Sequence, residues 1–112
     1  MSQITTHILD TSLGKPAEGV SASLEQRVEG AWNEIGNGTT DGDGRIGTLL
    51  QQDTVLDPGV FRLIFNTGDY YSRKGTECFY PKVVIVFETT DSSHYHVPLL
   101  LNPFGYSTYR GS

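Results

Sequence analysis

Cysteine is nearly absent from this sequence, and so are long apolar segments. Cys78 is the single cysteine among 112 residues, so it has no partner for an intramolecular disulfide, a CxxC redox pair or a cysteine-based zinc site. The longest uninterrupted apolar run, residues 83–87, is far shorter than the ~20 residues of a membrane-spanning helix. The N-terminus has no basic segment followed by an apolar one, so no secretory signal is expected. These absences predict a soluble protein of the reducing cytoplasm without a membrane partner.

Positive charge is also scarce. There are 8 Lys and Arg residues against 13 Asp and Glu residues, and the net charge is -5 at pH 7. Such a chain offers no basic surface to a phosphate backbone, so nucleic acid is not expected as a partner. Hydrophobic residues make up 37% of the chain, and its 112 residues suit one core and one domain, residues 1–112.

Alternating and β-branched segments predict a fold of short strands. Residues 20–28 alternate apolar and polar side chains as on a half-buried strand, with Val28 as the last apolar position of the buried side. A return arm should run back to a glycine-rich turn at residues 36–38. Further strands are predicted over residues 60–65, 79–87 and 95–101. The spacing of the turns indicates about seven or eight strands, which favours an all-β sandwich of two sheets.

One segment lacks the strand alternation. Residues 69–74 begin with a possible N-cap, Asp69, and predict a short helix between two strands.

A polar loop precedes an arginine. Residues 39–44 read Thr-Thr-Asp-Gly-Asp-Gly, which predicts a tight loop with Arg45 at its exit. The two aspartates resemble the start of a calcium-binding loop. A twelve-residue frame from Asp41, however, places Arg45 at the fifth position and Gln52 where a bidentate Glu belongs, so calcium is excluded.

The three histidines are the first candidates for acid–base chemistry near neutral pH. A strand through residues 95–101 would bury its odd-numbered side chains and place on the other face His94, His96, Pro98 and Leu100. This mixture of imidazoles and apolar groups fits a pocket lining or a subunit interface. Spacing alone leaves two alternatives open. The pair could be ordinary surface residues, or a metal half-site that would need His7 or a carboxylate as a further ligand.

Three motifs carry a resemblance to a known family. Residues 95–112, which end in Tyr-Arg-Gly-Ser, resemble the closing motif of the 5-hydroxyisourate hydrolases, the transthyretin-like enzymes of urate breakdown. Residues 6–17 (Thr-His-Ile-Leu-Asp-Thr through Gly-Lys-Pro-Ala) and 40–45 (Thr-Asp-Gly-Asp-Gly-Arg) are similar to the family's N-terminal and central motifs. The chain departs from the usual tail at Asn102, where Ser is common, and at Phe104, where Tyr is common, and neither is a catalytic position.

The resemblance implies a transthyretin-like sandwich of two four-stranded sheets with one short helix. It also implies a homotetramer, a dimer of dimers, with active sites where the dimers meet. Motif by motif, it gives catalytic roles to His7, Arg45, His96 and Ser112, and substrate binding to His7, Arg45 and Tyr109. His94 is not among the transferred positions, and no cofactor or metal is implied.

The implied reaction is hydrolysis of 5-hydroxyisourate to 2-oxo-4-hydroxy-4-carboxy-5-ureidoimidazoline, on the route from urate to allantoin. Imidazoles can activate water and protonate the leaving ring nitrogen, and a guanidinium can hold the developing oxyanion, so the chemistry needs no metal. The alternative is a non-catalytic carrier similar to transthyretin, which binds thyroid hormones in the same channel. One fold can host both functions.

Overall fold

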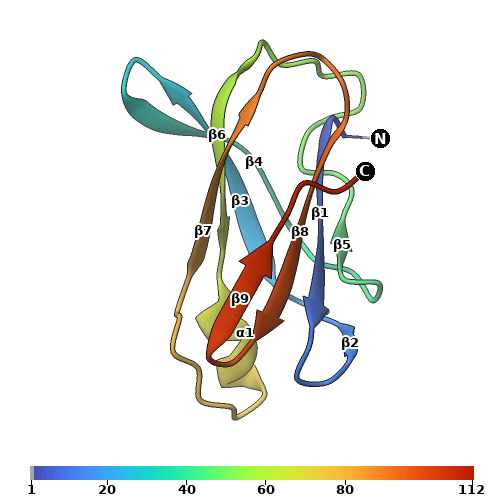
Figure 1. The fold of residues 1–112 in the computed structure, drawn as a ribbon, viewed down its shortest axis with the longest axis vertical. Coiled ribbons are helices and arrows are strands. Elements are labelled where there is room, and N and C mark those ends of the chain that lie inside the picture. Colours follow the sequence, from blue (N-terminus) through green and yellow to red (C-terminus); the bar gives the residue numbers. More distant parts are fainter. Residues whose placement is uncertain (1) are drawn as a thin grey trace.

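Two β-sheets face each other in the computed structural model, which describes residues 2–112 (Figure 1). The first sheet has the order β4 (Ala31–Thr39), β3 (Ser21–Val28), β6 (Gly59–Phe65) and β7 (Val83–Thr89). The second has the order β2 (Lys15–Pro16), β1 (Ile4–Asp10), β8 (Tyr95–Asn102) and β9 (Gly105–Thr108), and β5 (Arg45–Ile46) also pairs with β1. Helix α1 (Thr67–Arg73) follows β6. The two-sheet all-β sandwich with a short helix is confirmed. The resemblance implied two four-stranded sheets, and the second sheet has a fifth strand, β5. Strands β2 and β5 are only two residues long, too short to leave an alternation in the sequence.

The core lies between the sheets and follows the predicted alternation. Strand β6 buries every second side chain from Phe61 to Phe65, and β8 buries Tyr95, Val97, Leu99 and Leu101. Fully burying one such apolar side chain stabilises the fold by roughly 1.5–3 kcal/mol. The even-numbered residues of β8 therefore lie on the outer face of their sheet.

Strands β3 and β4 form the predicted hairpin. Its two turn residues, Glu29 and Gly30, have φ of 53° and 80°, which is typical of the turn whose twist matches that of the strands. The hairpin projects beyond its neighbours in Figure 1, and the pairing of β3 with β6 ends at Gln26. Val28 is consequently 42% exposed, so its assignment to the buried side of the core was wrong.

The glycine-rich segment 36–38 belongs to β4 and is not a turn. A Cβ on Gly36 would lie 1.9 Å from the carbonyl oxygen of Leu49, and one on Gly38 would lie 2.6 Å from Cγ2 of Ile46. These glycines allow β5 and the segment after it to approach β4 closely. Composition alone does not distinguish such a glycine from one in a turn.

The segment before β7 is also irregular, although residues 79–82 were predicted as strand. The carbonyls of Tyr80 and Pro81 accept hydrogen bonds from the side chain of Thr67 and the N–H of Gly68 at the start of α1. Those carbonyls are therefore bonded to the helix and are not available to a neighbouring strand. Pro81 also has no N–H to donate to such a strand, so the segment does not join the sheet.

The short helix is confirmed but begins earlier than predicted. Its N-cap is Asn66, and Asp69 lies in the first turn, where a carboxylate favours the helix N-terminus. The helix begins directly after β6 ends at Phe65. The N-terminal boundary of the helix is therefore set by the end of the strand and not by the first acidic residue. No helix in residues 2–112 has both the length and the apolar composition to cross a membrane.

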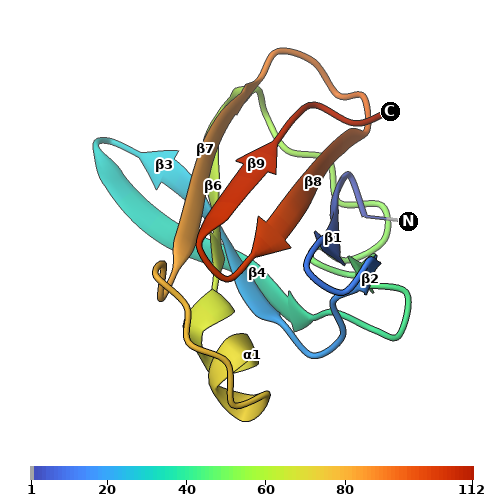
Figure 2. The same cartoon turned by 60° about the horizontal axis from the view of Figure 1, so that its bottom comes forward.

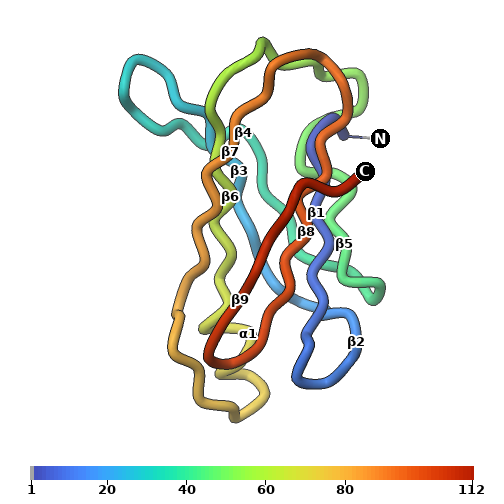
Figure 3. The backbone as a smooth tube through the Cα atoms, in the orientation of Figure 1, coloured from blue at the N-terminus to red at the C-terminus, as the bar shows by residue number. Residues whose placement is uncertain are grey.

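Strands β1 and β8 lie side by side and parallel, although one is first and the other nearly last in the chain (Figures 2 and 3). The C-terminal residues run back along β8 toward the start of β1, as both views show. Residues from both ends of the sequence thus meet on one sheet.

Candidate active site

Strand pairing places the predicted histidines and the arginine on one face. In the parallel ladder of β1 and β8, Thr5 lies opposite His96 and His7 lies opposite Pro98. In the antiparallel ladder of β1 and β5, His7 lies opposite Arg45. Because directly paired residues and every second residue share a face, all of these side chains leave the sheet on its outer side.

The loop before β5 holds Arg45 in place. Oδ1 of Asp41 accepts hydrogen bonds from the backbone N–H of Arg45 at 3.0 Å and of Asp43 at 2.9 Å. The Arg45 N–H, followed by the Asp43 N–H and the Arg45 charge, holds the pKa of Asp41 below its ordinary value. Gly44 has φ of 74°, and a Cβ there would lie 2.4 Å from the carbonyl oxygen of Ile8, so the loop requires glycine where it packs on β1.

His96 is the half-buried centre of the group. Its ring centroid lies 6.4 Å from that of His7, with the planes 30° apart. Burial, followed by the positive charge of Arg45 and by His7 and His94, lowers the pKa of His96 from its ordinary value of 6.5. The imidazole is therefore neutral at neutral pH, the form that can accept a proton.

The C-terminal segment closes one side of this group. The N–H of Gly111 donates a 2.8 Å hydrogen bond to the carbonyl of His96, and the two residues form an isolated antiparallel bridge. A cavity of about 370 Å³ opens beside them on the outer face. Its lining includes Thr5, Arg45, Gly47, His94, His96 and Ser112. His7 is not part of this lining and lies next to it, paired with Arg45.

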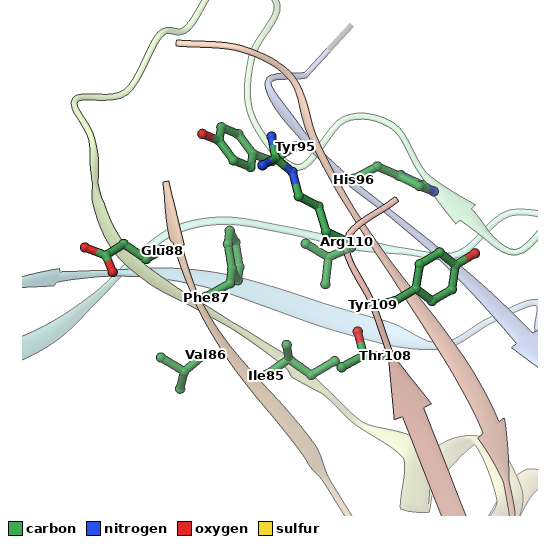
Figure 4. A pocket seen from close by; sticks show the side chains of 10 residues that line it. Ile85, Val86, Phe87, Glu88, Tyr95, His96, Thr108, Tyr109 and Arg110 are labelled. Atoms are coloured by element: carbon green, nitrogen blue, oxygen red, sulfur yellow. The ribbon is translucent and has the colours of Figure 1, made fainter. Parts of the chain in front are cut away.

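Tyr109 lies apart from that cavity within the single chain. It is 58% exposed and lines a second cavity of about 240 Å³, together with residues of β7, with Arg110 and with His96, which lines both cavities. In Figure 4 the His96 ring points away from Phe87, on the other side of β8. The guanidinium carbon of Arg110 lies 4.6 Å from the ring centroid of Tyr95, a cation–π contact that helps to hold the tail against the sandwich.

The sequence analysis did not single out Thr5, and it placed His94 on the face of His96 without a transferred role. Oγ1 of Thr5 lies 2.8 Å from Nε2 of His94 and 2.8 Å from Nδ1 of His96. The signal was present in the spacing, because Thr5 stands two residues before His7 and His94 two before His96. Only the parallel register of β1 and β8 shows that the two pairs meet.

The residue types suit acid–base chemistry on a small polar substrate. Imidazoles exchange protons near neutral pH, and a guanidinium offers a planar fork of donors to carbonyl oxygens. Among residues 2–112 there is no cluster of three or more His, Cys, Asp or Glu side chains that could hold a metal ion.

Known proteins resemble this chain over nearly its whole length. The model of the HIUase/Transthyretin family matches residues 4–111. The 5-hydroxyisourate hydrolase of Salmonella typhimurium is 46% identical over 110 residues, which cover 97% of this chain and 80% of that protein. The structure of the 5-hydroxyisourate hydrolase of Klebsiella pneumoniae superposes with a TM-score of 0.85 at 41% identity, covering 97% of this chain and 98% of that one.

A transthyretin is also similar in structure. The crystal structure of sea bream transthyretin in complex with thyroxine superposes with a TM-score of 0.91 at 32% identity, covering 98% of this chain and 95% of that one. Both the fold and the sequence therefore agree with the resemblance of the three motifs, and the chain belongs to the HIUase/Transthyretin family.

Proposed function

We propose that this chain is a 5-hydroxyisourate hydrolase of urate degradation, which forms 2-oxo-4-hydroxy-4-carboxy-5-ureidoimidazoline by metal-free attack of water. The observation that carries the proposal is that Arg45 and His96 line one cavity, with His7 paired to Arg45 at its edge. The identity of 41–46% to hydrolases over nearly the whole chain supports the same activity.

The imidazoles divide the proton transfers. One neutral imidazole, His7 or His96, takes a proton from water as the oxygen attacks the ring carbonyl carbon. The tetrahedral intermediate then collapses, the ring carbon–nitrogen bond breaks, and an imidazolium gives a proton to the departing nitrogen. The lowered pKa of His96 supports its part in this exchange, because its ring is neutral at neutral pH. General acid–base catalysis of this kind is worth roughly 10²–10⁴ in rate.

Arg45 binds the substrate and stabilises the oxyanion. Its guanidinium can donate two parallel hydrogen bonds to carbonyl oxygens, and its charge opposes the negative charge that develops during attack. An oxyanion donor typically contributes about 10²–10³ in rate. The hydrogen bonds of Asp41 to the loop support this role, since they fix the backbone from which Arg45 extends.

Ser112 and Tyr109 complete the proposed site. Ser112 lines the cavity beside His96 and can orient that imidazole. Tyr109 binds the ring of the substrate. We propose that the protein is a homotetramer, a dimer of dimers, and that Tyr109 contacts the substrate in this assembly. The active sites would lie where the dimers meet, because the cavity opens on the outer face of the sheet. A crystal structure with a purine-like ligand tests the assembly: the ligand should contact residues of two subunits.

The rival function is a carrier that binds a small molecule without reaction, as the similarity to the thyroxine-bound sea bream transthyretin suggests. The identity to the hydrolases exceeds the 32% to that transthyretin. The grouping of two imidazoles and a guanidinium also favours chemistry over simple binding. We propose the reducing cytoplasm as the compartment of the protein, because its single cysteine has no partner for an intramolecular disulfide.

The decisive experiment generates 5-hydroxyisourate with urate oxidase and follows its ultraviolet absorbance. The protein should accelerate the decay, whereas a rate equal to the spontaneous one would favour the carrier. His7→Ala, Arg45→Ala and His96→Ala should each lower kcat/KM by about 10²-fold or more, while the assembly stays intact. Deletion of residues 109–112 should abolish activity although the core strands remain. An active deletion variant would refute the role of the tail.

A further inference from the structure

The hydroxyl of Thr5 lies between two imidazoles. Its oxygen is 2.8 Å from Nε2 of His94 and 2.8 Å from Nδ1 of His96, and within residues 2–112 these nitrogens are its hydrogen-bond partners. Thr5 is only 8% exposed, so bulk water has little access to the hydroxyl. A hydroxyl has a single hydrogen, so Thr5 can donate to one imidazole at a time and accepts from the other.

The direction of that hydrogen decides the tautomer of both rings. When Thr5 donates to Nε2 of His94, it accepts from an Nδ1–H of His96, and Nε2 of His96 keeps a free lone pair. When Thr5 donates to Nδ1 of His96, the remaining hydrogen of the neutral His96 ring sits on Nε2. In the first arrangement His96 can act as a base through Nε2, and in the second it cannot.

We propose that Thr5 and His94 are positioning residues that hold His96 in the tautomer with hydrogen on Nδ1, so that Nε2 can accept the proton of the attacking water. This inference rests on the proposed function, in which His96 exchanges protons in the cavity. His94 is exposed, so water can satisfy its other ring nitrogen in either tautomer. His94 is thereby free to adopt the form that Thr5 requires.

Protonation of His94 reverses the arrangement. Its Nε2 then carries a hydrogen and must donate to Thr5, which leaves the hydroxyl hydrogen for Nδ1 of His96. The other charged or titratable groups around the pair are Arg45 and His7 on the same sheet face and Asp53, which lines a small cavity with His94. The rate therefore falls in acid when His94 is protonated, in addition to any direct protonation of His96.

The first test is NMR of protein with isotope-labelled histidine, which distinguishes protonated from unprotonated ring nitrogens. The chain has 3 histidines, so His7→Ala and His94→Gln assign the signals by loss. At neutral pH, His96 should carry its hydrogen on Nδ1. Hydrogen on Nε2 of His96 in the wild type would overturn the inference. This measurement needs no substrate, so it tests the tautomer of His96 independently of the proposed reaction. The proposed reaction itself is tested by the activity of His96→Ala.

The second test compares two changes at one position. Thr5→Val keeps the shape and loses the hydroxyl, whereas Thr5→Ser keeps the hydroxyl. Thr5→Val should lower kcat about 10- to 100-fold and abolish the Nδ1–H preference of His96, and Thr5→Ser should retain both. Full activity of Thr5→Val, or an unchanged tautomer in it, contradicts the inference. If Thr5→Val does not assemble, the spectrum of the wild type and of Thr5→Ser still decides the tautomer.

The third test removes the titration of His94. Glutamine can place a hydrogen-bond acceptor where Nε2 of His94 lies, but it does not titrate near neutral pH. His94→Gln should move the acidic fall of kcat, measured relative to the plateau of the variant itself, to lower pH. An unchanged acidic limb would overturn the role of His94.

Discussion

The N–H of Gly111 donates a 2.8 Å hydrogen bond to the carbonyl of His96, and this bridge fixes the tail beside the ring that lines the cavity. The contact is tight. A Cβ on Gly111 would lie 2.7 Å from Cδ2 of His96 and 3.1 Å from Cγ of Pro98. The glycine of the Tyr-Arg-Gly-Ser motif is therefore required by packing against the imidazole, not by an unusual φ.

Gly111→Ala should displace either the tail or the His96 ring. We expect kcat/KM to fall at least tenfold with a loss of stability of only ~1–2 kcal/mol, because the clash lies on the outer face of the sheet and not in the core. Steady-state kinetics and thermal unfolding measure the two effects. Gly42→Ala is the matched control, since a Cβ there meets nothing within 4 Å among the described residues, and it should keep full activity. Full activity of Gly111→Ala would show that the packing of the C-terminal segment on His96 is not needed for catalysis.

The charge of Arg45 should be visible in the titration of His96. After burial, Arg45 is the largest cause that holds the pKa of His96 below 6.5, and it acts by disfavouring the imidazolium. Arg45→Gln should therefore raise the pKa of His96 toward its ordinary value, while burial keeps part of the depression. NMR titration of the His96 ring measures the midpoint.

Arg62→Gln serves as the control for that titration, because Arg62 pairs with Glu25 on the other sheet. In the wild type the part of the acidic fall of kcat/KM that comes from protonation of His96 should lie below pH 6.5, since its neutral ring is the active base. Any variant that raises the pKa should move this part of the fall upward. A midpoint that does not move in Arg45→Gln would show that Arg45 does not act on His96.

The loop that carries Arg45 should depend on an acceptor at position 41. Asp41→Ala removes the oxygen that binds the N–H groups of Asp43 and Arg45, and we expect kcat/KM to fall about tenfold as Arg45 loses its position. Asp41→Asn keeps that oxygen and should retain most of the activity. Steady-state kinetics with 5-hydroxyisourate measure kcat/KM of the two variants. Equal losses would show that activity depends on the charge of Asp41 and not on its hydrogen bonds to the loop.

A buried carboxylate offers a test of stability away from the site. Tyr70 donates a 2.8 Å hydrogen bond to Oδ2 of Asp10, which is fully buried. Tyr70→Phe should reduce the free energy of unfolding by roughly 1–3 kcal/mol, because it leaves part of a buried acceptor unsatisfied. Chemical denaturation of the assembled protein measures the change.

Tyr71→Phe is the control for that change. The hydroxyl of Tyr71 is buried without a hydrogen-bond partner among residues 2–112, so its removal should cost nothing or stabilise slightly. Equal destabilisation by the two substitutions would contradict this account of the core.

Removal of metal ions should not affect the reaction. Two imidazoles and a guanidinium supply the proton transfers and the positive charge that the proposed mechanism uses. Dialysis against a chelator should therefore leave kcat/KM unchanged. Loss of activity that returns with Zn²⁺ would contradict the metal-free mechanism.

The strands with a clear pattern were predictable from the sequence. Phe61, Leu63 and Phe65, and the odd-numbered residues of β8, are buried as the alternation indicated, because side chains on a strand must alternate between core and outer face. The predictions that failed depend on partners distant in the chain. Gly36 lies against Leu49 and Gly38 against Ile46 of β5. The carbonyls of Tyr80 and Pro81 accept hydrogen bonds from the start of α1, which the local strand pattern does not indicate.

The sequence by itself determined the residue types of the site, its three motifs and hence the family. Only the tertiary structure decided that Thr5 stands opposite His96, that Arg45 stands opposite His7, and that Tyr109 lines a different cavity within one chain. A motif specifies side chains and their local spacing. The register of a parallel pair between the first and a late strand is instead set by which apolar side chains fit the core, and a shift of one residue would turn every one of these groups to the other face.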